Sequence, residues 1–558
     1  MTIKCGPLKA EMSCMNHLFD AVFKQFDSST AFSMNSASIS FTELNHKSHQ
    51  IASWLYHNSN LQPGDRVVLQ LPNMLQFPLF VIACMRAGLV LVLANPTYTP
   101  TELHFILKDS QAKGLITFAP LARKASIAME GTDIDTVILT ELGDLHPGFK
   151  GSLINQYVRR FAIPFSKDAI PQAFWLKELL QYEPNPRWQP VTQHASDLAL
   201  LQYTGGTTGT PKGAMLSHQN LIANLSQLKH LLEIYTESGQ ERLYQPLPLY
   251  HIYAFTLTWS LFTQGAHAHL ILDPSNSKAL AQQLKQFKPT ICAGINPLFS
   301  ALMKQKCITP HAFSSLKLTI SGGMALSKHL AQEWHEFTGC PIAEGYGLTE
   351  CSPVVSVNRP DNIHLGTAGE LLQHTSIRII DEIGASLPMG EIGEIQVKGP
   401  QVMMGYWNQP DETQKVIDQE GWLSTGDIGF LTSEGRLSII DRKKELICVS
   451  GFNVFPSELE ALVCDIPGVE DCAAIGIPDA ITGERIKLYV VTHSTSLTAD
   501  SIRNYCKERL IGYKVPNSIE FCSQLPRSAV GKVQRGKLKE LAERIKDASY
   551  TSQQLRSR

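Results

Sequence analysis

The sequence predicts an α/β protein, with a large N-terminal part of layered α/β sheets and a small α+β unit after it. Segments of period 3.6 alternate with short β-branched runs through most of the first 440 residues, the pattern of sheets covered by helices. The 558 residues suffice for several folding units. Hydrophobic residues make up 43 % and charged residues 18 %, which excludes wholesale disorder.

The early elements follow one another in a regular order. We expect a helix over 41–56, a strand over 66–71, a helix over 77–87, a strand over 89–93 and a helix over 99–108. The apolar stretch 77–94 carries Arg86 at its middle. It is too short to cross a bilayer, which needs roughly 20 apolar residues, so we expect a buried helix and a core strand. Residues 141–196 are richer in Pro and Gly and read as an irregular excursion.

A change of charge marks the small unit. From Asp441 onward there are 18 basic and 15 acidic residues, against 31 and 36 before it. We expect a helix beginning FPSELEALV, with Ser457 as its cap, Glu460 completing a capping box, and Leu459, Leu462 and Val463 facing inward. Strands near 473–477, 486–492 and 518–522 and a helix near 500–510 complete the unit.

Charge and cysteine usage limit the binding partners and the cellular compartment that fit the sequence. The net charge of −2 gives no global attraction for nucleic acid. Twelve cysteines form no CxxC pair, which favours reduced thiols in a cytoplasmic protein. A peripheral contact with the inner face of the membrane stays open. The basic segment from Arg527 onward fits either a solvated helix or a contact with anionic lipid.

A glycine- and threonine-rich loop follows the predicted strand 197–203. It reads TGGTTGTPKG over 204–213, and 214–216 looks extended again. Glycines let the backbone approach an anion, the threonine hydroxyls add donors, and Lys212 adds a positive charge. It is not a Walker A loop, because Pro211 stands before the lysine where a helix should begin. A plain hairpin loop is the alternative, and the composition favours phosphate binding.

Seven motifs in one order carry a family resemblance. They are YTGGTTGTPKG at 203–213, PLYH at 248–251, EGYGLTE at 344–350, STGD at 424–427, DRKKELI at 441–447, SGFNVFPSELE at 450–460 and LPRSAVGK at 525–532. This set resembles the AMP-forming adenylate ligases, and within them the bacterial long-chain fatty acid–CoA ligases. The resemblance implies an AMP-binding domain over 1–440 and a mobile C-terminal lid domain over 441–558. It also implies activation of a long-chain fatty acid to acyl-CoA through acyl-AMP, with ATP, Mg²⁺ and CoA.

The resemblance also implies roles for particular residues. Lys532, Glu350 and Thr204 are the expected catalytic residues, and Glu350 with Thr204 is the expected magnesium site. The expected ATP and AMP contacts are Thr204, Gly205, Gly206, Thr207, Thr208, Gly209, Lys212, Gly322, Gly323, Glu344, Gly345, Tyr346, Gly347, Thr349, Asp427 and Arg442.

The resemblance also implies residues that contact the fatty acid and CoA. His251 and Gly294 are expected in the acyl pocket. Phe255, Leu257, Trp259 and Phe262 could line an acyl tunnel or form core. Asp441 is the expected hinge, and Lys444, Ser450, Gly451 and Phe452 the expected CoA side.

Several alternatives stay open. The acceptor could be a carrier protein, the acid could be aryl or of medium length, and a homodimer is compatible with the sequence. A non-catalytic acyl- or nucleotide-binding protein would be expected to lose Lys532, Glu350 or the threonine loop, and all are present. Two segments depart from the family pattern: Val533-Gln-Arg-Gly-Lys537 after the lysine, and 366–374, which lacks a Gly-x-Pro step.

Overall fold

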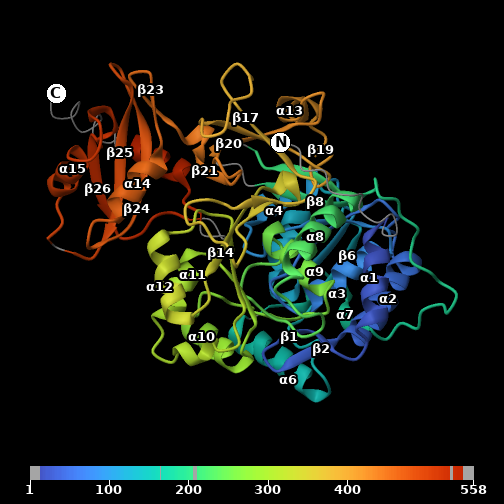
Figure 1. Cartoon of the computed structure of the whole chain (residues 1–558). Coiled ribbons are helices and arrows are strands. Elements are labelled where there is room, and N and C mark those ends of the chain that lie inside the picture. The colour runs from blue at the N-terminus through green and yellow to red at the C-terminus, as the bar shows by residue number, and fades with distance from the viewer. Residues whose placement is uncertain (1–12, 164, 205–209, 495, 528–531, 545–558) are drawn as a thin grey trace, which may run out of the picture. The chain divides into compact units, whose positions relative to one another are not determined.

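The computed structural model describes residues 13–163, 165–204, 210–494, 496–527 and 532–544. The chain divides into two compact units (Figure 1). The first comprises residues 1–205, 211–376 and 397–423, and the second comprises 206–210, 377–396 and 424–558. The predicted boundary between 440 and 441 concerns a lid that moves, and it stays a prediction.

Two large sheets build the first unit. The nine-stranded sheet has the order β16-β15-β14-β13-β12-β10-β11-β1-β2. Its strands are β1 (Thr30–Met34), β2 (Ala37–Ser40), β10 (Arg242–Gln245), β11 (His267–Leu270), β12 (Ile291–Gly294), β13 (Leu318–Gly322), β14 (Ile342–Gly347), β15 (Val354–Val357) and β16 (Glu370–Leu371). Strands β10 to β14 pair in parallel, so their carboxyl ends meet at one edge, where open α/β sheets hold ligands.

The eight-stranded sheet has the order β19-β9-β8-β4-β3-β5-β6-β7. Its strands are β3 (Arg66–Gln70), β4 (Val90–Leu93), β5 (Gly114–Phe118), β6 (Thr136–Thr140), β7 (Phe174–Trp175), β8 (Leu198–Thr204), β9 (Lys212–Ser217) and β19 (Gly405–Tyr406). Its central strands β3, β4 and β5 are buried except at the half-buried Arg66 that starts β3, as expected of parallel strands with both faces covered.

The first unit also contains α-helices. They are α1 (Met15–Gln25), α2 (Phe41–Asn58), α3 (Gln76–Arg86), α4 (Pro100–Asp109), α5 (Ala122–Met129), α6 (Phe149–Tyr157), α7 (Leu176–Leu179), α8 (His218–Leu232), α9 (Ile252–Phe262), α10 (Ser277–Phe287), α11 (Asn296–Met303), α12 (Lys328–Thr338) and α13 (Pro410–Val416). In the part of the chain that the structure describes, no helix is both long and apolar enough to traverse a bilayer.

Among the described residues, the second unit contains two smaller sheets, the helices α14 and α15, and a further helical segment over 535–544. The order β17-β18-β20-β21 joins Ser376–Ile380, Gly393–Lys398, Leu423–Leu431 and Leu437–Arg442. The other sheet consists of β22 (Ile447–Val449), β23 (Phe452–Val454), β24 (Val469–Asp479), β25 (Gly483–Thr492) and β26 (Ser518–Cys522). Helices α14 (Pro456–Cys464) and α15 (Ala499–Lys507) accompany it, and both contribute buried side chains to one apolar cluster.

Most predicted elements are confirmed within one or two residues. Helix α3 is buried at every position, and strand β4 follows it in the core. Arg86 is tolerated there because its guanidinium donates to the Asn45 carbonyl and Ser48 hydroxyl and pairs with Asp20. A buried charge needs such partners. The region 141–196 is less irregular than expected, since it contains α6, β7 and α7.

The predicted Ser457 capping box is wrong. Helix α14 starts at Pro456, so Ser457 lies inside its first turn, where proline is well suited to the first position. The Ser457 hydroxyl donates to the Ile440 carbonyl at 2.6 Å, and its backbone N–H donates to the Asp441 carboxylate at 2.9 Å. Glu460 is committed elsewhere, because it binds Arg535. A carboxylate outside the helix has taken the capping role.

Candidate active site

The predicted phosphate loop lies between two antiparallel strands of the first unit, β8 and β9. Strands β8 and β9 pair so that Thr204 faces Lys212, and the Thr204 hydroxyl donates to the Lys212 carbonyl at 3.4 Å. Gly205, Gly206, Thr207, Thr208 and Gly209 lie outside the described residues. The hairpin therefore fixes both ends of the predicted loop.

Lys212 is held by residues far away in the sequence. Its ammonium forms an ion pair with Glu412 on α13 and lies 5.1 Å from the centre of the Tyr406 ring. Lys415 contacts the same carboxylate at 2.5 Å. The hydrogen bond from Lys212 has the largest effect on the pKa of Glu412, and together with the hydrogen bond from Lys415 it lowers this pKa to about 2. Neither Glu412 nor Tyr406 was singled out from the sequence, because no local motif marks them.

Glu350 lies in a short 3₁₀ turn, Thr349–Cys351, after β14. Its Oε1 accepts a hydrogen bond from the Tyr406 hydroxyl at 2.8 Å, and its carbonyl accepts from the Met403 backbone N–H at 2.8 Å. Tyr406 belongs to β19, which pairs with β9. One tyrosine thus connects the Glu350 carboxylate with the Lys212 strand. Glu350 and Thr204 both offer hard oxygen atoms, the ligand type that Mg²⁺ prefers.

Four glycines, which we call the glycine edge, lie where β13 and β14 end side by side: Gly322, Gly323, Gly345 and Gly347. Gly322 faces Gly345 across the parallel pair. A Cβ at Gly322 would lie 3.3 Å from the Tyr253 ring, and a Cβ at Gly347 would lie 2.2 Å from the Pro353 carbonyl oxygen. Gly323 has φ +84°, which glycine adopts without strain. Protein atoms thus occupy the space beside Gly322 and Gly347, whereas a Cβ at Gly323 would meet nothing within 4 Å.

Glu344 brings a carboxyl group into the same edge. It faces Ser321 in the register of β13 and β14, and it accepts a hydrogen bond from the Leu326 backbone N–H at 2.9 Å. Burial raises the pKa of Glu344 to about 7 and outweighs that hydrogen bond. The side chain is consequently protonated in a large fraction of molecules near neutral pH.

His251 and Gly294 both have local structural tasks. The His251 Nδ1 accepts from the Tyr253 backbone N–H at 3.3 Å and so caps α9. Gly294 ends β12, and a Cβ there would lie 2.6 Å from the Phe299 ring.

The aromatic side chains of α9 pack into the core. Trp259 and Phe262 lie 5.0 Å apart between ring centroids, and Phe19 lies 5.1 Å from Trp259. Phe255 and Leu257 are buried as well. These side chains were expected either to line an acyl tunnel or to form core, and the structure shows them packed in the core.

In the second unit, Asp427 and Arg442 form one pair. They face each other across β20 and β21, and the Arg442 Nε lies 2.6 Å from the Asp427 Oδ1. Asp427 is 2 % exposed, so its carboxylate is held in a fixed direction. Such a carboxylate can accept hydrogen bonds from a diol.

Asp441 and the turn after it lie next to this pair in the chain. The Asp441 carboxylate accepts from the backbone N–H groups of Arg442 and Ser457. Lys444 is exposed in the following 3₁₀ turn, Lys443–Glu445. Ser450 and Gly451 have φ of 52° and 83° in the turn between β22 and β23. Phe452 is 56 % exposed, and its ring stacks on Tyr513 at 4.8 Å.

Lys532 is exposed, and Arg527, Val533 and Arg535 near it in the chain have defined partners. Arg527 and Val533 form a β-bridge on either side of it. Arg535, three residues later, lies 2.6 Å from Glu445 and 2.8 Å from Glu460. This network was not foreseen, and it fixes the atypical run after Lys532 to the 3₁₀ turn and to α14.

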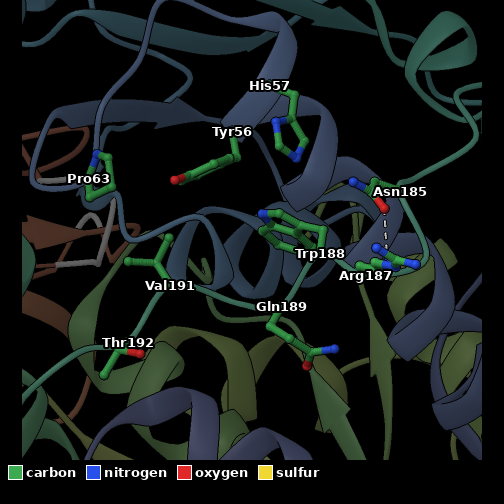
Figure 2. A pocket seen from close by; sticks show the side chains of 9 residues that line it. All are labelled: Tyr56, His57, Pro63, Asn185, Arg187, Trp188, Gln189, Val191 and Thr192. Atoms are coloured by element: carbon green, nitrogen blue, oxygen red, sulfur yellow. Dashed lines mark hydrogen bonds between the residues drawn. The ribbon is translucent and has the colours of Figure 1, made fainter.

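A separate surface pocket of about 420 Å³ contains none of the predicted site residues. Figure 2 shows its lining: Tyr56, His57, Pro63, Asn185, Arg187, Trp188, Gln189, Val191 and Thr192. The Arg187 backbone N–H donates to the Asn185 side chain at 3.0 Å. It is a feature of the first unit and shares no lining residue with the glycine edge.

Comparison with known proteins identifies the class. The model of the AMP-binding enzyme family matches residues 19–407, and that of the AMP-binding enzyme C-terminal domain matches 458–532. The chain belongs to the AMP-binding enzyme family.

Named relatives cover nearly the whole chain. A long-chain-fatty-acid–CoA ligase of Salmonella typhimurium is 40 % identical over 94 % of both chains. The Bacillus subtilis protein of that name is 33 % identical over 92 % of both. The ATP-bound structure of MatB from Rhodopseudomonas palustris superposes with a TM-score of 0.82 at 29 % identity, covering 96 % of this chain and all of the other.

Proposed function

We infer that the protein activates a fatty acid to its CoA thioester at the expense of ATP, through an acyl-AMP intermediate, with release of AMP and pyrophosphate. The similarity to the Salmonella typhimurium long-chain-fatty-acid–CoA ligase over almost the full length is the observation that carries this conclusion. The substrates are a fatty acid, ATP and CoA, and Mg²⁺ accompanies the nucleotide. A long chain is the acid that the relatives' names favour.

We propose distinct tasks for the charged residues of the first unit. Glu350 with Thr204 holds Mg²⁺, and Lys212 with the threonine loop binds the phosphates. Supporting observations are the Tyr406 hydrogen bond, which orients the Glu350 carboxylate, and the hairpin that fixes Thr204 and Lys212. Positioning and charge neutralisation dominate phosphoryl chemistry, so these contacts serve the step directly. The adenine ring binds at the glycine edge, beside Tyr346 and Glu344.

For the second unit we propose that Asp427 and Arg442 hold the ribose and that Lys532 meets the carboxylate and the α-phosphate during adenylation. The fixed direction of the Asp427 carboxylate supports the first assignment. The defined partners of the residues near Lys532 support the second. We further propose that Asp441 is the hinge of a lid domain over 441–558, and that Lys444 and the Ser450–Phe452 turn serve CoA.

We propose three finer points as well. They are a cytoplasmic location, a peripheral contact with the membrane, and a homodimer. Size-exclusion chromatography with light scattering decides the last: a mass of one chain at all concentrations contradicts it.

Product analysis tests the proposed reaction. The enzyme is incubated with ATP, Mg²⁺, CoA and an equimolar mixture of short, medium, long-chain and aryl acids, and the products are identified by mass spectrometry. We expect long-chain acyl-CoA with stoichiometric AMP. Acyl-AMP alone would indicate a carrier protein as acceptor. An aryl-CoA product would show that the substrate is an aryl acid and not a long-chain fatty acid. No product would contradict the reaction.

A further inference from the structure

Helix α6 and the π-helical turn that continues it, Val158–Ala162, expose a row of apolar side chains. We call these four residues, which are spaced by four in the sequence, the outer stripe. Their exposed fractions are 74 % for Phe149, 55 % for Leu153, 62 % for Tyr157 and 71 % for Phe161. The rings of Tyr157 and Phe161 lie 5.7 Å apart. In Figure 1, α6 lies at the lower edge of the first unit.

The opposite side of the same helix faces the protein. Gly151, Asn155 and Arg159 are also four apart and are offset by two residues from the outer stripe, about 200° around the helix. A Cβ at Gly151 would lie 2.2 Å from the Gly143 carbonyl oxygen. The Asn155 amide donates to the Asp144 carboxylate at 2.9 Å and accepts from the Gly143 backbone N–H at 2.6 Å.

Arg159 completes this attachment. It forms an ion pair with Glu141, whose side chain is 5 % exposed, and the hydrogen bond to Glu141 raises the pKa of Arg159. Helix α6 is therefore fixed by glycine and polar side chains while its apolar side faces outward. Surface helices of globular proteins normally have the reverse arrangement, and exposed apolar rows of this kind mark interaction sites.

The charges around the outer stripe select the partner. From residue 145 to residue 166 the sequence contains three basic residues and no Asp or Glu. Two of them, Lys150 and Arg160, are exposed beside the stripe. Aromatic and leucine side chains flanked by cations are the composition of helices that lie in a lipid interface. Each cation adds about 1 kcal/mol of attraction to an anionic leaflet.

We propose that the outer stripe of α6 docks on an anionic lipid bilayer, with Lys150 and Arg160 among the headgroups. A second copy of the chain is the weaker occupant. A two-fold interface would set this face against itself, and like charges from both copies would meet there. The net charge of −2 supplies no long-range attraction, so this local patch must provide it. The proposal rests on the proposed function only in that the bilayer would supply the fatty acid.

Vesicle sedimentation without substrates tests the proposal. The full-length protein is mixed with phosphatidylcholine vesicles, with or without phosphatidylglycerol, at low and at high salt. We expect binding to the anionic vesicles that weakens with salt. The stripe variant Leu153→Ser/Phe161→Ser should bind at least about tenfold more weakly. The charge variant Lys150→Gln/Arg160→Gln should bind roughly 30-fold more weakly.

Matched controls separate this surface from others. Ile234→Ser changes an isoleucine that is 65 % exposed in the same unit, and Lys537→Gln/Lys539→Gln changes the basic C-terminal segment. Both should bind as the unaltered protein does. The proposal fails if the unaltered protein does not bind, if the stripe variant binds normally, or if only the C-terminal variant loses binding.

Two further measurements complete the design. If light scattering gives a dimer for the unaltered protein and a monomer for the stripe variant, the stripe joins two copies and the bilayer proposal is overturned. If the stripe variant does not fold, hydrogen exchange on the unaltered protein decides. Anionic vesicles should protect amides of 149–162, and unchanged exchange there contradicts the proposal. No arm uses ATP or acid, so a failure of fatty acid activation would be recorded separately.

Discussion

Glu344 offers a quantitative test of the edge where β13 and β14 end. Its pKa is raised from 4.5 to about 7 by burial. Between these values the folded protein holds a proton that the unfolded chain has lost, so the free energy of unfolding decreases as pH rises. Glu344→Gln replaces the carboxyl with a neutral group of the same shape. The variant should therefore match the protein below pH 4.5 and become the more stable of the two as pH rises.

The size of the effect follows from the shift. One pKa unit corresponds to about 1.4 kcal/mol. Because the side chain is partly exposed, we reduce the difference in unfolding free energy that the whole shift implies to about 2–3 kcal/mol. The unit holding Glu344 has about 400 residues. At roughly 2 cal/mol/K per residue its unfolding entropy is about 0.8 kcal/mol/K, so Tm of the variant should be higher by about 3 °C above pH 7.

Calorimetric scans of both proteins at one scan rate, from pH 5 to above pH 8, check this expectation. The exposed Glu336→Gln serves as the control for the exchange of a glutamate for a glutamine. A Tm difference for Glu344→Gln that stays constant over the whole range would refute the reasoning, because the burial cost of the charged form would then be absent.

Three further substitutions test separate contacts. Tyr406→Phe removes the hydrogen bond to Glu350. Because hydrogen bonds to charged groups contribute about 1.5–3 kcal/mol, we expect kcat/KM for adenylation to drop at least about tenfold. An unchanged kcat/KM would contradict the orienting role of Tyr406. Arg535→Ala leaves two carboxylates uncompensated, one of them on Glu445, and should lower the unfolding free energy of the second unit by about 3–5 kcal/mol; an unaltered urea midpoint argues against this. Lys532→Ala should slow adenylation about 10²–10³-fold and spare thioester formation from supplied acyl-AMP, and equal loss in both half-reactions refutes its assignment.

Much of the fold was predictable because local and long-range preferences agree. The run Gln76–Arg86 is apolar on all sides, and a helix of that kind has to be buried. The capping box at Thr99 and Glu102 forms as its spacing suggests. Strands β8 and β9 flank the loop whose composition singled it out.

The rest depends on partners that are distant in the sequence. Tyr406 and Glu412 reach Glu350 and Lys212 across 56 and 200 residues, and no local pattern announces them. The Ser457 prediction failed because the Asp441 carboxylate competes for the first turn of α14. Helix α6 was missed because its apolar residues face outward and glycines interrupt its pattern, so the usual inward-facing signal is weak.

The most direct test of the central claim uses a fatty acid labelled with ¹⁸O in its carboxylate. If the carboxylate attacks the α-phosphorus of ATP and CoA then displaces AMP, one labelled oxygen stays on the AMP that is released. We predict that mass spectrometry finds AMP with one ¹⁸O, formed together with acyl-CoA. Unlabelled AMP, or label in a phosphate product formed with ADP, would contradict activation through acyl-AMP.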